Sequence, residues 1–283
     1  MEKASKAAPA LSIQAPARTA LGDRAVRDPD SSTAADPLQL GNYAKEIHSN
    51  LLQAEVSVDP GYLDNQPHIN FKLRAILVDW IVEAHRKFKL DPETLYLAVS
   101  LVDRYMERVS IEKKHLQLLG AASLLIAAKY EEIYPPLVRD FIRLTENTYR
   151  KRDLLLMESD ILRVLDFRIT TPSPLRFLQR YAHVTGAPAG AVELASFLNE
   201  LALVEYKMLK FKPSVVAAGA LCTALGVCQQ ASLWTDQRLD RHALKQCVEE
   251  FKLIMKVHHS HPLTAVKAKY PPLPALTEIE VLV

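Results

Sequence analysis

Apolar residues recur at helical spacing along most of the chain. The pattern begins near Leu40, where Tyr43, Ile47, Leu51 and Leu52 fall on one side of a helix. From there one helical pattern follows another, and there is almost no alternation of the kind that marks strands. The chain is therefore predicted to be all-α.

Helix-start signals divide this pattern into segments. Asp91-Pro92 and Ser173-Pro174 each place an N-cap acceptor before a proline at the first helical position. Pro135-Pro136 and Lys212-Pro213 mark further starts. After the helix that begins near Leu40, helices are predicted at 70–88, 92–108, 113–131, 136–145, 151–165, 174–184, 191–207, 213–229, 239–257 and 263–269.

These ten helices form two sets of five, joined by a linker from Asp166 to Pro172. A small-residue stretch in the first set, Gly120-Ala121-Ala122, has a faint echo in the second, Ala217-Ala218-Gly219-Ala220. Helices with small residues on most faces are approached closely from several sides, which suits the centre of a bundle. Two interpretations fit this echo, a duplicated architecture and two unrelated buried helices. We place the two domains at 39–166 and 167–270, followed by a C-terminal tail at 271–283.

The N-terminal 38 residues have a different composition. Residues 1–38 are rich in Ala, Pro, Ser and Asp and contain no aromatic residue. Such a segment buries too little apolar surface to offset the entropy lost on ordering. We expect it to be a disordered tail.

Composition and charge exclude several classes of protein. The 283 residues suffice for one large or two ordinary domains, and 49% hydrophobic with 24% charged residues is typical of a soluble protein with a sizeable core. The net charge of +2 gives no indication of nucleic-acid or anionic-membrane binding. The longest apolar run, 118–128, is too short to cross a bilayer, and the N-terminus lacks a signal-peptide core. An intracellular protein is expected.

The sequence contains no recognisable catalytic constellation. It lacks H-E-x-x-H, G-x-S-x-G and phosphate-loop motifs, and no two of its eight glycines are separated by a single residue. Cys222, Cys228 and Cys247 form no C-x-x-C pair and are read as buried free thiols. The near-adjacent residues His258-His259 and His261 lack the spacing of a metal site. We expect neither a cofactor nor a metal, and an enzyme with an unfamiliar helical site is the remote alternative.

The helix at 70–88 is apolar on more than one face. Leu73, Ile76, Leu77, Trp80 and Ala84 form one stripe, and further apolar residues cover other faces. A helix that serves a single core needs one stripe only. Two interpretations follow, a central and fully enclosed helix, and a helix that leaves part of its surface open as a groove for a partner.

Several long motifs, in order, resemble the cyclin family. Residues 71–80, FKLRAILVDW, are similar to the opening of the cyclin box, and 95–105 and 116–120 are similar to its next segments. Residues 127–136, AAKYEEIYPP, match its most diagnostic stretch. The resemblance continues through 157–158 and 165–167, and more loosely to about residue 270. It implies two tandem five-helix cyclin boxes and a non-catalytic subunit, of the mitotic B-like kind, that activates a cyclin-dependent kinase.

The resemblance also implies two partner-binding surfaces. Lys129 and Glu158 match residues that grip the αC helix of the kinase, with apolar contacts alongside from Tyr130, Leu162, Phe167 and Ile169. A hydrophobic docking patch for short basic-apolar motifs of substrates and inhibitors would comprise Leu73, Ile76, Leu77, Trp80, Leu116 and Gln117, with Glu83 pairing the arginine of the motif. Leu73 stands where methionine is usual. Arg74 and Asp103 match a buried ion pair between two helices.

The tail carries a motif that resembles the destruction box of mitotic cyclins. Residues 18–24 read RTALGDR, in which Arg18 and Leu21 would be read by the anaphase-promoting complex. Val26 stands where asparagine is usual. By the same resemblance we expect the protein in nucleus and cytoplasm.

The main alternative is a transcription-associated cyclin or a cyclin-fold general transcription factor. A member that contacts DNA should carry a basic face on its repeat domains. Here 35 Lys and Arg residues are dispersed among 33 Asp and Glu residues, which favours the cell-division interpretation.

Overall fold

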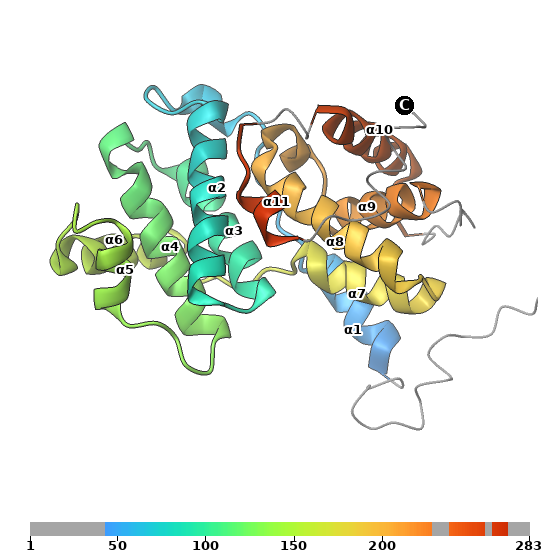
Figure 1. Ribbon diagram of the computed structural model, residues 1–283, viewed down its shortest axis with the longest axis horizontal. Helices are drawn as coiled ribbons and strands as arrows, with labels where there is room; N and C mark the ends of the chain where they lie inside the picture. The colour runs from blue at the N-terminus through green and yellow to red at the C-terminus, as the bar shows by residue number, and fades with distance from the viewer. Residues whose placement is uncertain (1–42, 228–237, 258–261, 271–283) are drawn as a thin grey trace, which may run out of the picture. The chain divides into compact units, whose positions relative to one another are not determined.

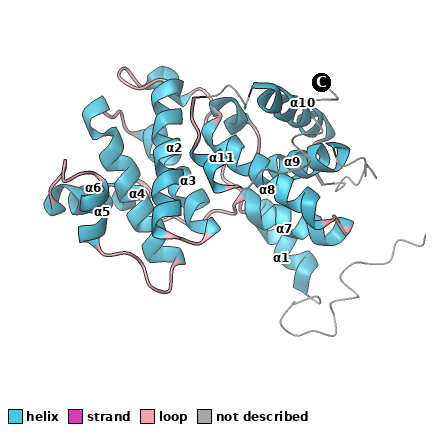
Figure 2. Ribbon diagram, viewed as in Figure 1, coloured by secondary structure: helices cyan, strands magenta, loops and turns pink. Residues whose placement is uncertain are grey.

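All regular elements in the described residues are helices. A computed structural model describes residues 43–227, 238–257 and 262–270, and no strand occurs in these ranges (Figure 2). The helices are α1 (Ala44–Gln53), η4 (Tyr62–Asn65), α2 (Phe71–Phe88), α3 (Pro92–Arg108), η5 (Lys113–His115), α4 (Leu116–Glu131), α5 (Val138–Leu144), α6 (Lys151–Val164), α7 (Pro174–Thr185), α8 (Ala189–Val204), η6 (Tyr206–Lys210), α9 (Pro213–Val227), α10 (Arg241–Val257) and α11 (Ala265–Lys269). The prediction of two tandem sets of five helices after an N-terminal helix is confirmed, as α2–α6 and α7–α11 (Figure 1). No helix among the described residues is long and apolar enough to span a membrane.

The predicted helix starts follow from local capping. The side chain of Asp91 accepts a hydrogen bond from the Glu93 amide at 2.9 Å, ahead of Pro92 at the first position of α3. Ser173 caps α7 in the same way, accepting from the Arg176 amide at 3.2 Å. These caps satisfy N–H groups that have no partner within the helix.

Several predicted helix ends differ from the structure by two or three residues. The first turn of the helix expected at 113–131 is a separate 3-10 turn. The helix expected at 136–145 begins at Val138, because the Asp140 carboxylate accepts from the Leu137 amide at 3.1 Å and fixes the start there. The helix expected at 191–207 stops at Val204 and gives way to η6.

The helices α4 and α9 occupy central positions in the two sets. The neighbours of α4 are α2, α3, α5 and α6, and those of α9 are α7, α8 and α10. A Cβ at Gly120 would lie 2.7 Å from Cδ1 of Leu77, and one at Gly219 would lie 2.7 Å from Sγ of Cys247. Each glycine therefore lets a neighbouring helix pack against the central helix. The two small-residue stretches mark equivalent places in the two sets.

A buried ion pair joins α2 to α3, as predicted, and also reaches the second set. Nε and Nη2 of Arg74 donate to the two carboxylate oxygens of Asp103 at 2.7 and 2.6 Å. Its remaining nitrogen, Nη1, donates to the carbonyls of Leu203 and Val204 at the end of α8 at 2.9 and 3.4 Å. One guanidinium thus binds a carboxylate in one set and caps a helix in the other.

The charge of Asp103 keeps Arg74 protonated in spite of its burial. Burial alone would lower the pKa of Arg74, but the adjacent Asp103 carboxylate reverses that effect and the pKa is raised. The Tyr62 hydroxyl donates to the same carboxylate at 2.8 Å, and burial followed by Asp103 raises the pKa of that phenol. The Asp103 carboxylate therefore accepts hydrogen bonds from side chains of two elements, Tyr62 on η4 and Arg74 on α2.

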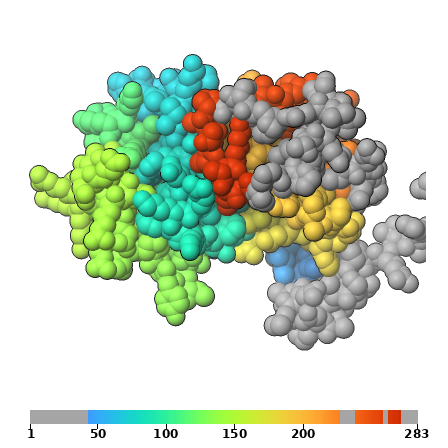
Figure 3. All heavy atoms as spheres, viewed as in Figure 1, coloured from blue at the N-terminus to red at the C-terminus, as the bar shows by residue number. Residues whose placement is uncertain are grey.

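The short helix α11 returns to the first set and packs between α2 and α8 (Figure 1). Its first amide, that of Ala265, donates to Oδ1 of Asp79 at 3.0 Å. At its other end Lys269 and Tyr270 both donate to Oε1 of Glu200 on α8, at 2.6 and 2.8 Å. Figure 3 shows this segment, in red, at the surface beside the first set. The chain thus fastens its two helical sets together near its C-terminal end.

Candidate partner-binding surfaces

The predicted pair of charged residues forms a direct contact between the end of α4 and the middle of α6. Nζ of Lys129 lies 2.6 Å from Oε1 of Glu158, and their side chains are 46% and 13% exposed. An ion pair this close to solvent contributes about 0–1 kcal/mol to stability. The fold therefore depends little on it, and both charges are within reach of a partner.

The four apolar residues predicted beside this pair lie on the same two helices and in the loop that follows α6. Tyr130, next to Lys129, is exposed, and its hydroxyl lies 2.5 Å from that of Thr170. The amide of Phe167 donates to the carbonyl of Leu162 at 2.9 Å, and the amide of Ile169 donates to that of Phe167 at 3.0 Å. Leu162 and Ile169 are half-buried against the core, and Phe167 is 72% exposed. Together these six residues form what we call the α4–α6 surface.

The turn after α6 holds Phe167 in an unfavourable backbone conformation. Asp166 and Phe167 have φ values of 51° and 57°, in the left-handed region that costs an ordinary L-residue about 1–2 kcal/mol. The turn after α5 has the same pattern of four backbone hydrogen bonds, and its residues Glu146 and Asn147 have φ values of 53° and 59°. Asparagine tolerates this conformation well and phenylalanine does not. Phe167 thus occupies the position that Asn147 occupies in the turn after α5. It is exposed to solvent and has a backbone conformation that phenylalanine disfavours.

Sequence reasoning missed exposed apolar residues in the loop between α4 and α5. Ile133 and Tyr134 are almost fully exposed, and Leu137 is more than half exposed. They lie within a few residues of Lys129 and Tyr130, in a loop that contains two prolines. Exposed large apolar side chains gathered in one area mark an interaction site. The sequence contains a signal for this exposure. Apolar residues that follow a helix end and flank two prolines do not belong to a helix, so no helical face packs them against the core.

The second predicted surface lies on α2 and the start of α4. Ile76 and Glu83 are exposed, and Leu73, Trp80 and Gln117 are half-buried. Leu77 and Leu116 are buried and belong to the core. Of the two interpretations of this helix, the partly open one agrees with the structure: the outer members of the stripe reach solvent, and Gly120 lets Leu77 pack closely onto α4. We call these seven residues the α2 patch, with Leu77 and Leu116 beneath its surface.

The described residues contain no group of three or more His, Cys, Asp or Glu side chains that could hold a metal ion. Cys247 is buried and Cys222 half-buried, and burial raises the pKa of both thiols. A raised pKa keeps a thiol protonated and unreactive. Both are free thiols, and the prediction of a buried thiol is confirmed for Cys247. Cys228, the histidines at 258, 259 and 261, and the tail motif with Arg18 and Leu21 lie outside the described residues.

Comparison with known proteins assigns the chain to a family. The cyclin N-terminal domain matches residues 46–170, and the cyclin C-terminal domain matches residues 172–275. The chain belongs to the cyclin family. The resemblance inferred from its motifs is confirmed, and α2–α6 and α7–α11 are its two cyclin boxes.

Relatives of this cyclin include A-type and B-type cyclins. It is 36% identical to Cyclin-B2-1 of Oryza sativa subsp. japonica over 88% of its length and 39% identical to Cyclin-A2 of Xenopus laevis over 82%. It is 42% identical to G2/mitotic-specific cyclin-B2 of Gallus gallus over 70%. The chain spans 61%, 57% and 50% of the lengths of these three relatives.

Solved structures show the same fold. A viral cyclin from herpesvirus saimiri superposes with a TM-score of 0.58 at 22% identity, covering 83% of this cyclin and 99% of the viral chain. A chain of the yeast RNA Pol II CTD kinase CTDK-1 complex superposes with a TM-score of 0.62 at 12% identity, covering 80% and 84%. At these identities the likeness concerns the fold alone.

Proposed function

We propose that this cyclin is the non-catalytic regulatory subunit of a cyclin-dependent protein kinase, which it binds and activates in the mitotic cell cycle. The observation that carries the proposal is the α4–α6 surface, which combines the Lys129–Glu158 pair with the strongly exposed Phe167 in the turn after α6. An exposed aromatic in a strained turn, together with charges that the fold hardly needs, is suited to a partner and not to the isolated protein.

The chemistry of this surface suits the αC helix of a kinase. A protein kinase is active only when a glutamate on αC pairs with the β3 lysine, so a partner that holds αC inward activates it. Lys129 offers ammonium donors and Glu158 carboxylate acceptors for polar groups of such a helix. The apolar residues Tyr130, Leu162, Phe167 and Ile169 offer the area to pack against it.

Affinity purification followed by a phosphorylation assay tests this function. We expect the purified cyclin to have no phosphotransfer activity alone, to recover a cyclin-dependent kinase from dividing cells, and to raise the activity of that kinase when recombined with it. Phosphotransfer by the isolated chain, or a recovered kinase whose activity does not change, would contradict the proposal.

We further propose that the α2 patch recruits substrates and inhibitors with short basic-apolar motifs. The exposed Ile76 and half-buried Leu73 and Trp80 would receive the apolar residue, and Glu83, which is exposed one turn from Trp80, would pair with the basic one. The patch lies on α2 and the start of α4, away from the end of α4 that carries Lys129. Docking and activation are therefore separable.

Replacing Trp80 by alanine should weaken motif binding by about thirtyfold, the loss of about 2 kcal/mol typical of an interfacial tryptophan. Basal stimulation of the kinase toward a short peptide without the motif should persist. Binding of a labelled motif peptide and both kinase assays measure this, with Leu253→Ala, an exposed apolar residue on α10, as the matched control. Unchanged peptide binding, or loss of basal activation in a folded variant, would show that docking and activation do not use separate surfaces.

We also propose that the tail motif anchored by Arg18 and Leu21 directs degradation through the anaphase-promoting complex. Removal of residues 18–26 should prolong the lifetime of the protein through mitotic exit, measured by immunoblotting after release from arrest. Removal of residues 28–36, a segment of the same length without the motif, provides the control. Equal lifetimes for the two deletions would show that the motif is not read.

A further inference from the structure

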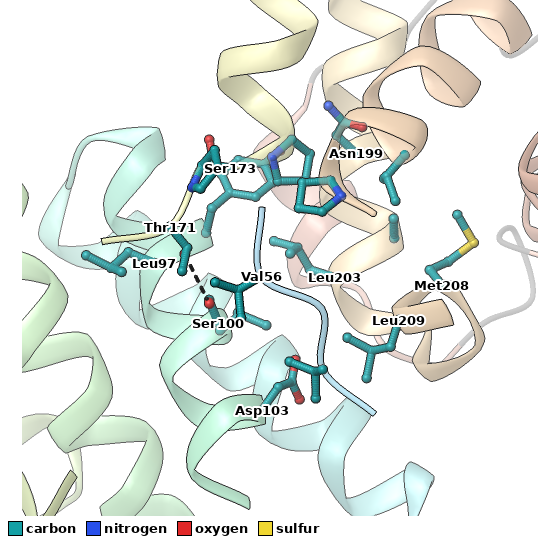
Figure 4. Close-up of a pocket in the computed structure, with 18 of the residues that line it drawn as sticks. Val56, Leu97, Ser100, Asp103, Thr171, Ser173, Asn199, Leu203, Met208 and Leu209 are labelled. Atoms are coloured by element: carbon teal, nitrogen blue, oxygen red, sulfur yellow. Dashed lines mark hydrogen bonds between the residues drawn. The ribbon is translucent and has the colours of Figure 1, made fainter. Parts of the chain in front are cut away.

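A cavity of about 130 Å³ lies where the two cyclin boxes meet. Figure 4 shows its wall, with Val56, from the irregular segment between α1 and η4, among residues of both boxes. Ser100 on α3 and Thr171 in the linker lie on one side of Val56, and Leu203 on α8 and Leu209 on η6 lie on the other. The cavity is separate from the α4–α6 surface and the α2 patch.

The size and lining of the cavity define what fits. An engineered apolar cavity of about 150 Å³ in another protein binds benzene, so a single six-membered ring is the appropriate size here. The wall is largely apolar, and its buried members include Leu97, Val99, Ala202, Met208 and Val216. Such a wall favours a flat apolar body.

One polar group in the wall has no partner. Asn199 on α8 is fully buried, and neither its amide oxygen nor its amide nitrogen has a hydrogen-bond partner within the described residues. Buried amides without partners are rare in folded proteins. Its amide offers a donor and an acceptor side by side, and the terminal torsion of asparagine has a broad range that can turn this edge toward the cavity. Figure 4 places Asn199 at the end of the cavity away from Asp103.

Three of the charged groups in the wall are already paired. Arg74 and Asp103 bind each other at 2.6 Å. Glu93 lies 3.0 Å from Nε of Arg176, and burial raises the pKa of its carboxyl group. Glu131, which is half-buried, also lines the wall. An anionic ligand would therefore lose its hydration here and face the carboxylates of Glu93 and Glu131, whereas a neutral ligand avoids that cost.

We propose that this cavity is a binding site for a small, neutral, planar ring that carries an adjacent hydrogen-bond donor and acceptor, such as a lactam, and that Asn199 pairs with that edge. The ring occupies the apolar part of the cavity, and the amide edge satisfies both unpaired atoms of Asn199. Because both cyclin boxes and the 56–58 segment line the cavity, the ligand contacts all three at once.

Two probes of nearly equal size test the proposal. 2-Pyridone has a ring of the size of benzene with a lactam edge, and benzene lacks that edge. Titration of the full chain, followed by NMR chemical shifts and by melting temperature, should show saturable binding of 2-pyridone at least tenfold tighter than that of benzene. Asn199→Leu should abolish this preference and leave benzene binding in place.

Filling the cavity provides the control for location. Ala202→Phe and, independently, Ser100→Leu should abolish binding of both probes, and two variants allow for one that does not fold. The proposal is overturned if 2-pyridone does not bind saturably, if Asn199→Leu leaves its affinity unchanged, or if binding persists in a folded cavity-filled variant.

Discussion

Replacing both Lys129 and Glu158 by alanine should abolish kinase binding while the helical fold remains intact. Both charges lie on the α4–α6 surface, and the removal of charged groups that pair across an interface costs about 2–5 kcal/mol of binding. The affinity should fall by roughly thirtyfold to several thousandfold. Stability should change by about 1 kcal/mol or less, because the lysine is half exposed and the pair is close to solvent.

A second ion pair in the same protein is a matched control. Nζ of Lys210 on η6 lies 2.7 Å from Oε1 of Glu250 on α10, with side chains 41% and 21% exposed. It resembles the Lys129–Glu158 pair in length and exposure but lies in the second cyclin box. Its double alanine variant should bind and activate the kinase normally. Pull-down and kinase assays measure binding and activation by both variants, and circular dichroism checks that they are folded. Kinase activation by the Lys129→Ala/Glu158→Ala protein would show that the interface is elsewhere.

Arg74→Ala should lower the free energy of unfolding by about 3–5 kcal/mol, the cost of leaving a buried partner charge without its counterion. Asp103 would keep only the Tyr62 hydroxyl as a partner, and the carbonyls of Leu203 and Val204 would lose theirs. A domain has about 5–15 kcal/mol of stability in total, so this one change would remove a large share of it.

Urea denaturation monitored by circular dichroism measures the effect, with Lys129→Ala as the exposed comparison. Arg74→Met combined with Asp103→Leu removes both charges and should be less destabilising than Arg74→Ala, because no uncompensated buried charge remains. An Arg74→Ala protein that loses less than about 1 kcal/mol would contradict the structural role assigned to this pair.

The helical architecture was predictable because its signals are local. Asp91 with Pro92 and Ser173 with Pro174 define helix starts through contacts within one turn, and the structure contains both caps. Boundaries failed where a local competitor was not considered, as when the Asp140 carboxylate fixes the start of α5 at Val138.

The two partner-binding surfaces depended on family motifs, and the physical pattern alone did not distinguish open from enclosed residues. Periodicity placed Ile76 and Leu77 in one apolar stripe, but Ile76 is exposed and Leu77 is buried against Gly120. Which member of a stripe faces solvent depends on the neighbouring helix, and hydrophobicity does not report that neighbour.

By itself the sequence determined that this protein is an all-helical cyclin with two boxes, because helical periodicity, caps and ordered motifs are properties of short stretches. Only the tertiary structure decided the contacts between stretches far apart. It showed Arg74 capping α8 some 130 residues away, α11 fastened to α2, and Asn199 unpaired beside a cavity at the junction of the boxes. Such contacts depend on how whole helices pack, which no local pattern encodes.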